Sequence, residues 1–234
     1  MKAVIPAAGL GTRLLPATKE QPKEMLPLFA RSRGGRECLK PIVQLIFEQL
    51  YELGLREFYF IVGRGKRAIE DHFTPHQDYL FALEGGKGDI IDELREFYLK
   101  IEDSSIVWIN QPKPLGFGDA IAKVAPFIGG ENILVHAGDT YIISDKNSHL
   151  KNLMRVFDEM NADAIFPIRR VEDPRQYGVA ETEEFGEGIF RVMRVIEKPK
   201  EPATDLAIMP IYIFRPIIFK ALREVLPGVG GRFS

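Results

Sequence analysis

The chain has 234 residues, of which 45% are hydrophobic and 27% are charged, and its formal net charge is -2 at neutral pH. These values are typical of a globular domain, and the near balance of charge argues against the positive field of a nucleic-acid-binding protein. The single cysteine, Cys38, excludes an internal disulfide and favours a reducing compartment. Neither a secretory signal nor an apolar run of about 20 residues is visible, so we expect a cytoplasmic protein that does not act on membranes.

The chain begins with the apolar run 2–6, which predicts a buried strand, and continues into the small-residue segment 7–13, AAGLGTR. Alanine and glycine let a backbone approach a ligand closely, and the N–H groups of such turns attract anions. Arg13 adds a planar charged fork that suits phosphate oxygens, and Lys23, in the proline-rich segment that follows, adds a second charge. The sequence therefore predicts a phosphate site directly after the first strand.

Two common phosphate-binding motifs fit this segment poorly. A Walker loop needs a glycine, four residues and then Gly-Lys-Ser/Thr, which does not occur here. The dinucleotide fingerprint needs a third glycine, but Leu14 stands in its place, and the first acidic residue near the expected ribose-binding position is Glu37. Leu14 and the missing ribose-binding acid both count against a nicotinamide-dependent oxidoreductase.

Helices and strands alternate through the rest of the first 169 residues. We expect a mobile basic loop over 28–40 and an inserted helical excursion over 76–103, which glycines at 85–88 interrupt. Further helices are predicted over 41–53, over about 66–73 and through 150–157. Further strands are predicted over 58–63, 106–109, 133–137 and 164–168. Such alternation predicts an α/β fold with a Rossmann-like mixed, mostly parallel sheet flanked by helices.

From residue 170 onward the pattern changes. Strands are predicted over 177–181, 189–197 and 206–214 with only turns between them, and a helix is predicted from 216 through 222. Short connections of this kind join antiparallel strands, because parallel strands need a longer crossover. We therefore expect a smaller antiparallel or mixed sheet in this part of the chain.

Polar segments follow the first, third and fourth predicted strands, and ligands in such folds bind beyond the carboxyl ends of parallel strands. A further polar segment ends the later predicted strand 189–197. Gln111, after the third strand, offers an amide donor and acceptor for one edge of a pyrimidine, although a plain turn is an alternative. Asp139, after the fourth, suits either a Mg²⁺ ligand or the cap of the next turn. Glu197 and Lys198, before Pro199, suit either a sugar phosphate or an ordinary surface ion pair.

Segment 7–13 and the segment PKEMLP at 22–27, in this order after a first strand, resemble the signature of the sugar-nucleotide pyrophosphorylases. They are most similar to the branch of bacterial and archaeal UTP–glucose-1-phosphate uridylyltransferases, and the resemblance covers essentially all of 1–230. It implies that UTP and glucose 1-phosphate give UDP-glucose and pyrophosphate, with Mg²⁺ as cofactor. It also implies a homo-oligomer, either a tetramer or a dimer, that binds no nucleic acid and no membrane.

The resemblance also implies a role for each matching residue. The nucleotide-binding residues would be Ala7, Ala8, Gly9, Gly11, Thr12, Arg13, Lys23, Gln111 and Gly116. The residues that bind the sugar phosphate would be Gly178, Glu197 and Lys198, with Asp139 on the metal. Arg13, Lys23 and Lys198 would be catalytic. The chain would form one nucleotidyltransferase domain over 1–234, with a nucleotide-binding part of about 1–169 and a sugar-binding part of about 170–234.

One departure from the family pattern bears on activity. A second metal aspartate of the family lies in a Thr-Asp pair beyond the position of Ser234, and the C-terminal helices of the family are also expected beyond it. Two alternatives to the uridylyltransferase therefore stay open. One is a glucose-1-phosphate thymidylyltransferase that uses dTTP, and the other is a non-catalytic, nucleotide-binding regulatory subunit of the same fold.

Overall fold

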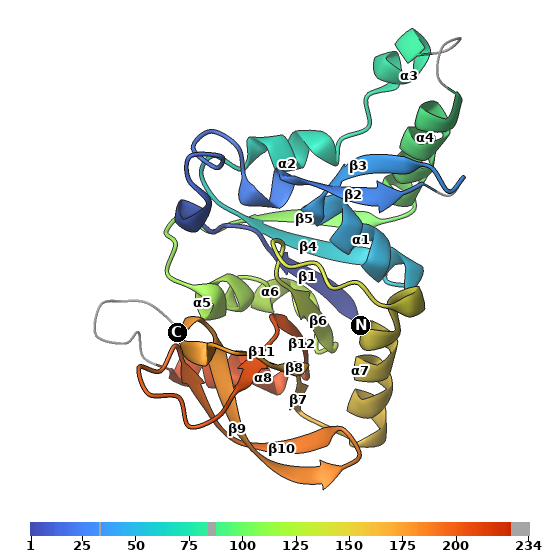
Figure 1. The fold of residues 1–234 in the computed structure, drawn as a ribbon. Helices are drawn as coiled ribbons and strands as arrows, with labels where there is room; N and C mark the ends of the chain where they lie inside the picture. Colours follow the sequence, from blue (N-terminus) through green and yellow to red (C-terminus); the bar gives the residue numbers. More distant parts are fainter. Residues whose placement is uncertain (33, 84–87, 226–234) are drawn as a thin grey trace.

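The computed structural model describes residues 1–32, 34–83 and 88–225, and its largest sheet is built around strand β1 (Lys2–Pro6). This sheet has six strands in the order β5-β4-β1-β6-β12-β7 (Figure 1). Its other strands are β4 (Glu57–Val62), β5 (Ser105–Asn110), β6 (Ile133–His136), β7 (Ala164–Ile165) and β12 (Ile211–Phe214). The pairs from β5 to β6 are parallel, whereas β12 is antiparallel to both of its neighbours. The predicted mixed, mostly parallel sheet is confirmed.

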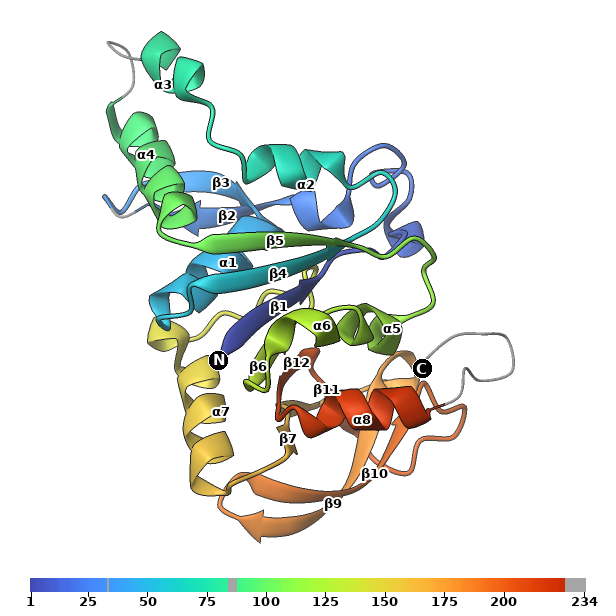
Figure 2. The same ribbon diagram turned by 180° about the vertical axis from the view of Figure 1, so that it is seen from behind.

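Helices cover both faces of this sheet, as Figure 2 shows from behind. Successive residues of a strand point to opposite faces, so Ala3 and Ile5 enter one core and Val4 enters the other. The first core is closed by α1 (Ile42–Glu52), α2 (Arg67–His72), α4 (Gly88–Glu102) and α7 (Ser148–Glu159). The second is closed by α5 (Phe117–Ala122), α6 (Ala125–Ile128) and α8 (Ile217–Glu224).

The inserted excursion is helical, as expected, and consists of α3 (Gln77–Leu83) and α4. Figures 1 and 2 both show α3 standing away from the sheet. The predicted glycine interruption falls largely on residues 84–87, which lie outside the described part. None of the described helices combines the length and the apolar character that crossing a membrane requires.

The second sheet is antiparallel, with the strand order β10-β9-β11-β8, which confirms the change of pattern expected after residue 170. Its strands are β8 (Ile168–Arg170), β9 (Gly178–Gly186), β10 (Ile189–Glu197) and β11 (Leu206–Ile208). Short 3-10 helices occur at η1 (Thr12–Leu14), η2 (Lys23–Met25), η3 (Asp145–Asn147) and η4 (Pro174–Gln176). The division at about 169 stays a prediction, and β12 and α8 return from the second part to the large sheet.

Two predictions of a single strand were wrong, because each predicted segment contains two strands that belong to different sheets. Segment 164–168 divides into β7 and β8 around Pro167, and segment 206–214 divides into β11 and β12 around Pro210. Proline has no N–H for a sheet ladder, so the pairing ends there. The carbonyl of Pro167 accepts from Met209 at 2.9 Å, and the carbonyl of Pro210 accepts from Ala137 at 2.9 Å. The two prolines therefore mark where the chain crosses between the sheets.

The expectation of a mobile basic loop over 28–40 was also wrong, because this segment is a β-hairpin. Strands β2 (Pro27–Arg31) and β3 (Glu37–Pro41) pair antiparallel along their whole length. Lys40 anchors the hairpin to α1, because its Nζ lies 2.8 Å from Glu48 Oε2 and both side chains are nearly buried. This ion pair, between residues eight apart in the sequence, joins the second strand of the hairpin to the helix that follows it.

His72 generates a prediction about stability. Its Nε2 lies 3.0 Å from Gln44 Oε1 and its ring packs on Phe97, and burial lowers its pKa from 6.5 to about 4. Below pH 6.5 the unfolded chain binds a proton at His72 that the native chain does not. The contribution of His72 to the free energy of unfolding, which is present above pH 6.5, is therefore lost as the pH falls. This group should remove about 2 kcal/mol from the free energy of unfolding between pH 7 and pH 5.

Urea denaturation at both pH values checks this prediction in the wild type and in His72→Gln. The variant should lose about 2 kcal/mol less than the wild type between pH 7 and pH 5. His76→Gln, at an exposed position four residues away, serves as the control and should behave as the wild type. Equal losses in the wild type and His72→Gln would contradict the assignment.

Candidate functional site

The carboxyl ends of four neighbouring parallel strands meet at one edge of the large sheet. Backbone hydrogen bonds continue the pairing into the loops that follow. Ala7 N donates to Ile61 O at 2.8 Å, and Gln111 N donates to Val62 O at 2.7 Å. Gly138 N donates to Pro6 O at 3.0 Å. The segments singled out after the first, third and fourth parallel strands therefore lie at the same edge.

The loop after β1 turns sharply at Gly11, which has φ 68° and begins η1. This left-handed conformation favours glycine, and the Gly11 carbonyl accepts a hydrogen bond from Thr18 Oγ1 at 2.7 Å. Arg13 lies in η1 and is exposed. Ala7 is buried at the base of the loop, whereas Gly9 and Thr12 are exposed. The loop thus presents small residues and one guanidinium to the outside.

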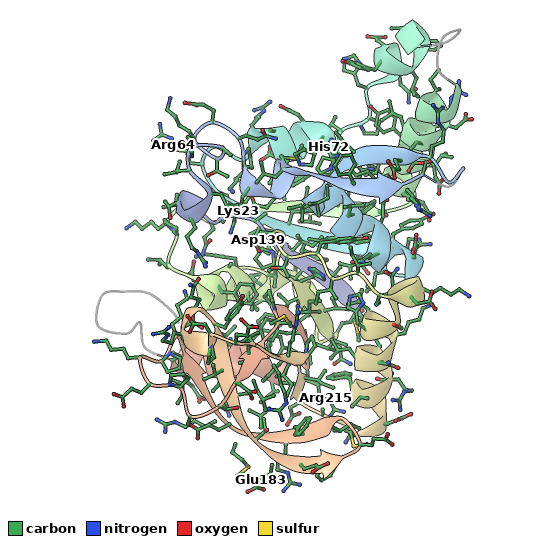
Figure 3. The ribbon with its side chains drawn as sticks, in the orientation of Figure 1. Lys23, Arg64, His72, Asp139, Glu183 and Arg215 are labelled. Carbon is green, nitrogen blue, oxygen red and sulfur yellow. The ribbon has the colours of Figure 1, made fainter. Side chains whose placement is uncertain are left out.

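Lys23 and Asp139 come together from two different loops (Figure 3). Lys23 Nζ forms an ion pair with Asp139 Oδ2, and the two side chains are 20% and 34% exposed. A Cβ added to Gly9 would lie 3.3 Å from Lys23 Nζ, so the lysine side chain passes directly over this glycine. The structure therefore brings three of the predicted residues into one place, where a cation and a carboxylate are both open to a ligand.

The amide of Gln111 is held in one orientation by its neighbours. Nε2 donates to Asp119 Oδ2 at 2.7 Å and to Gly116 O at 3.1 Å, so both of its hydrogens are used. Turning the amide over would place Oε1 against the Asp119 carboxylate, which fixes the assignment of oxygen and nitrogen. Only the amide oxygen is then available to a ligand as an acceptor. From the sequence alone, both the donor and the acceptor of the amide were expected to meet a ligand.

A tilted aromatic contact connects this turn to β12 of the large sheet. Gly116 has φ 115°, which favours glycine, and Phe117 directly after it lies 5.5 Å from the ring of Tyr212. Burial, together with the nearby Glu197 carboxylate, raises the pKa of Tyr212 to about 12. Tyr212 therefore contacts the turn that carries Gln111 and is affected by the charge of Glu197.

The predicted sugar-phosphate residues form their own cluster at the end of β10. Gly178 is paired with Glu197, and a Cβ at position 178 would lie 3.1 Å from Glu197 Oε2. Lys198 has φ 43°, an unfavourable backbone conformation for lysine that tends to occur at functional sites. Its Nζ lies 3.1 Å from Glu197 Oε1, and both side chains are about half exposed. Within the described chain, no hydrogen bond or ion pair joins this cluster to Lys23 or Asp139.

The residues around Asp139 suit a metal ion that arrives with a ligand. Among the residues that the structure describes, no group of three or more His, Cys, Asp or Glu side chains is placed to hold a metal ion alone. Mg²⁺ is commonly bound through one or two carboxylates together with phosphate oxygens and water. Asp139, a partly exposed carboxylate beside Lys23, fits such a shared site.

Four residues that support the site were not expected from the sequence. Asp119 fixes Gln111, and Thr18 holds the carbonyl of Gly11. Glu24 is part of the conspicuous segment 22–27, yet its partner Lys66, at 2.7 Å, lies 42 residues away. One feature of the sequence could have identified Lys66. It lies in the glycine-containing turn directly after β4, just as the other motifs follow parallel strands.

The chain matches the nucleotidyl transferase family over residues 2–228. A Bacillus subtilis protein named UTP–glucose-1-phosphate uridylyltransferase YngB is 37% identical, and the match covers 100% of this chain and 75% of that protein. A Streptococcus pneumoniae protein named UTP–glucose-1-phosphate uridylyltransferase is 36% identical, with coverage of 100% and 76%. A Methanocaldococcus jannaschii protein named for the same activity is 39% identical, with coverage of 100% and 78%.

Solved structures give the same relationship. The crystal structure of an apo UDP-glucose pyrophosphorylase is similar with a TM-score of 0.86 and 31% identity, over 100% of this chain and 83% of that one. A UDP-glucose pyrophosphorylase in complex with UDP-glucose is similar with a TM-score of 0.80 and 32% identity, over 99% and 82%.

The tight packing at Gly138 leads to a second stability prediction. A Cβ at this position would lie 3.1 Å from Pro6 O and 3.3 Å from Glu24 Cγ. We expect Gly138→Ala to lower the free energy of unfolding by about 1–3 kcal/mol, because backbone or buried side chain must move. Gly186→Ala, whose Cβ would meet no atom closer than 3.9 Å, should change it by less than about 0.5 kcal/mol. Urea denaturation measures both, and a wild-type value for Gly138→Ala would show that the loops at this edge are not tightly packed.

Proposed function

Because the chain belongs to the nucleotidyl transferase family, we propose that it transfers a uridylyl group from UTP to glucose 1-phosphate, giving UDP-glucose and pyrophosphate. The observation that carries the proposal is the arrangement of Lys23 over Gly9 and beside Asp139, at the edge where the loops of the parallel strands meet. The choice of UTP and glucose 1-phosphate is supported by the names of the bacterial relatives and by the similar protein solved with UDP-glucose.

The reaction is an in-line displacement at phosphorus. A phosphate oxygen of glucose 1-phosphate forms a bond to the α-phosphorus of UTP, while the bond from that phosphorus to the bridging oxygen of the β-phosphate breaks. Pyrophosphate leaves with the electron pair of the broken bond. Such a transfer depends on positioning and on stabilising negative charge more than on a protein nucleophile.

Charged residues of the site would meet the phosphates. Arg13 and Lys23 steady the triphosphate and the charge that develops on the leaving pyrophosphate. Asp139 would hold Mg²⁺ together with phosphate oxygens, and the ion supplies further charge neutralisation when bound. Before the phosphates arrive, the ion pair of Lys23 with Asp139 keeps both side chains in place.

The uracil base would lie against Ala8, Gly9 and Gly116, where small residues let the backbone approach a ring. Gln111 Oε1 accepts the N3–H of the base, since both Nε2 hydrogens are used by Asp119 and Gly116. Thymine carries the same N3–H, so Gln111 does not separate UTP from dTTP. That preference rests on the names of the relatives.

The sugar phosphate would bind at the end of β10. Lys198 directs the attacking phosphate, Glu197 accepts hydrogen bonds from the sugar hydroxyls, and Gly178 leaves room for the ring. Tyr212, which contacts Phe117 and lies close enough to Glu197 to be affected by its charge, would stand near both the sugar and the base. The expected homo-oligomer and the cytoplasmic location stay predictions, to be checked by light scattering and fractionation.

Pyrophosphate release tests the choice of nucleotide. With Mg²⁺ and glucose 1-phosphate, we expect fast release with UTP and at least about tenfold lower kcat/KM with dTTP, ATP, CTP or GTP. Preference for dTTP would keep the mechanism and replace the substrate. Binding of UTP without release from any nucleotide would favour the regulatory alternative.

Lys23→Ala tests the charged centre of the site. We expect kcat/KM for UTP to fall well over tenfold, because a cation beside the triphosphate is lost. Lys19→Ala is the matched control, since Lys19 is exposed in the same loop and, among the described residues, forms an ion pair with its neighbour Glu20 alone, at 3.2 Å. Steady-state kinetics and circular dichroism decide the outcome. A folded Lys23→Ala enzyme with wild-type turnover would remove Lys23 from the mechanism.

A further inference from the structure

An almost fully buried ion pair lies beneath the predicted phosphate site. Glu24 Oε2 and Lys66 Nζ are 2.7 Å apart, and their side chains are 1% and 7% exposed. Burying two charges costs several kcal/mol per ion, so such pairs rarely add net stability compared with apolar residues of similar size. A buried pair at this place therefore calls for a role other than stability.

The pair joins two of the loops at the carboxyl edge. Lys66 closes the turn after β4, where its N–H donates to Gly63 O at 3.3 Å and its carbonyl accepts from Ile69 at 2.9 Å. Glu24 is the middle residue of η2 and directly follows Lys23. The ion pair thus fixes the loop after β1 to the end of β4.

Glu24 also contacts the third loop. A Cβ at Gly138 would lie 3.3 Å from Glu24 Cγ, so the glutamate side chain fills the space beside the backbone that leads into Asp139. Lys23 and Asp139 are the chain neighbours of Glu24 and Gly138, respectively, and they form the exposed ion pair above this contact. Two adjacent contacts, one buried and one exposed, therefore hold η2 against the end of β6.

We infer that Lys66 and Glu24 are positioning residues for Lys23: Lys66 holds Glu24 in place, Glu24 packs η2 against Gly138, and Lys23 Nζ is thereby kept over Gly9 beside Asp139. Neither residue touches the substrate. The catalytic consequence rests on the proposed function, whereas the placement of Lys23 does not. Without Lys66, an unpaired carboxylate would be left buried, and it would either bind a proton or turn toward water and carry η2 with it.

The test compares variants by two independent readouts. The first is the rate at which trinitrobenzenesulfonate modifies Lys23, followed by peptide mass spectrometry without any substrate. The second is kcat with UTP and glucose 1-phosphate. In Lys66→Met we expect Lys23 to be modified at least about fivefold faster and kcat to fall at least about tenfold, because small displacements of a catalytic group have large effects.

Rescue and control variants separate positioning from a general loss of stability. The double variant Glu24→Met with Lys66→Met removes both charges and keeps similar volumes, and it should return both readouts to within about threefold of the wild type. Lys40→Met breaks another nearly buried group of charges, in which Lys40 pairs with Glu48 at 2.8 Å and with Glu93, and which includes none of Lys23, Glu24 and Lys66. It should lower the melting temperature and leave Lys23 modification unchanged.

If Lys66→Met does not fold, Glu24→Gln replaces it, since it keeps size and hydrogen bonding but removes the charge. It should accelerate Lys23 modification in the same direction by a smaller factor. Wild-type modification rates in the folded variants, or an equal acceleration in Lys40→Met, would overturn the inference. If the wild-type protein shows no turnover, only the proposed function is refuted. The positioning role is still decided by the rate of Lys23 modification, which needs no substrate.

Discussion

Parallel pairing of β5, β4, β1 and β6 is the constraint on which the rest of this structure depends. Four chain segments leave the sheet at the same edge because parallel strands share a direction, and ligands of such sheets bind there. Backbone hydrogen bonds from the loops back to neighbouring strands extend the order of the sheet beyond its last regular residue. The sheet therefore brings the residues of the site together, although they lie far apart in the sequence.

Three side chains at this edge have partners that hold them before any ligand binds. Lys23 has Asp139, Gln111 has Asp119, and Glu24 has Lys66. An unpaired buried charge or amide is costly, so the partners of Glu24 and Gln111 determine the direction of these side chains. Phosphoryl transfer gains most from groups that are already in place, since little covalent chemistry is left to the protein. Side chains that are already held in place suit the proposed mechanism, which uses no protein nucleophile.

The sequence was sufficient for the alternation of strands and helices and for the small-residue loop 7–13, because both depend on local patterns. It failed where contacts between distant residues decide the structure. The hairpin β2–β3 is joined to α4 by the ion pair of Lys40 with Glu93, and the crossings between sheets lie at Pro167 and Pro210, whose carbonyls accept bonds from remote N–H groups. For the same reason the amide of Gln111 could be identified, but not the use of its donors by Asp119.

The central claim is that this edge joins a nucleotide α-phosphorus to the phosphate of a sugar. The most direct test labels the non-bridging phosphate oxygens of glucose 1-phosphate with ¹⁸O. The labelled compound reacts with UTP, and mass spectrometry locates the label in the products. The account predicts that all of the label appears in UDP-glucose and none in pyrophosphate, because only the bond between the α-phosphorus and the leaving oxygen breaks. Label in pyrophosphate, or release of pyrophosphate with unchanged glucose 1-phosphate, would contradict it.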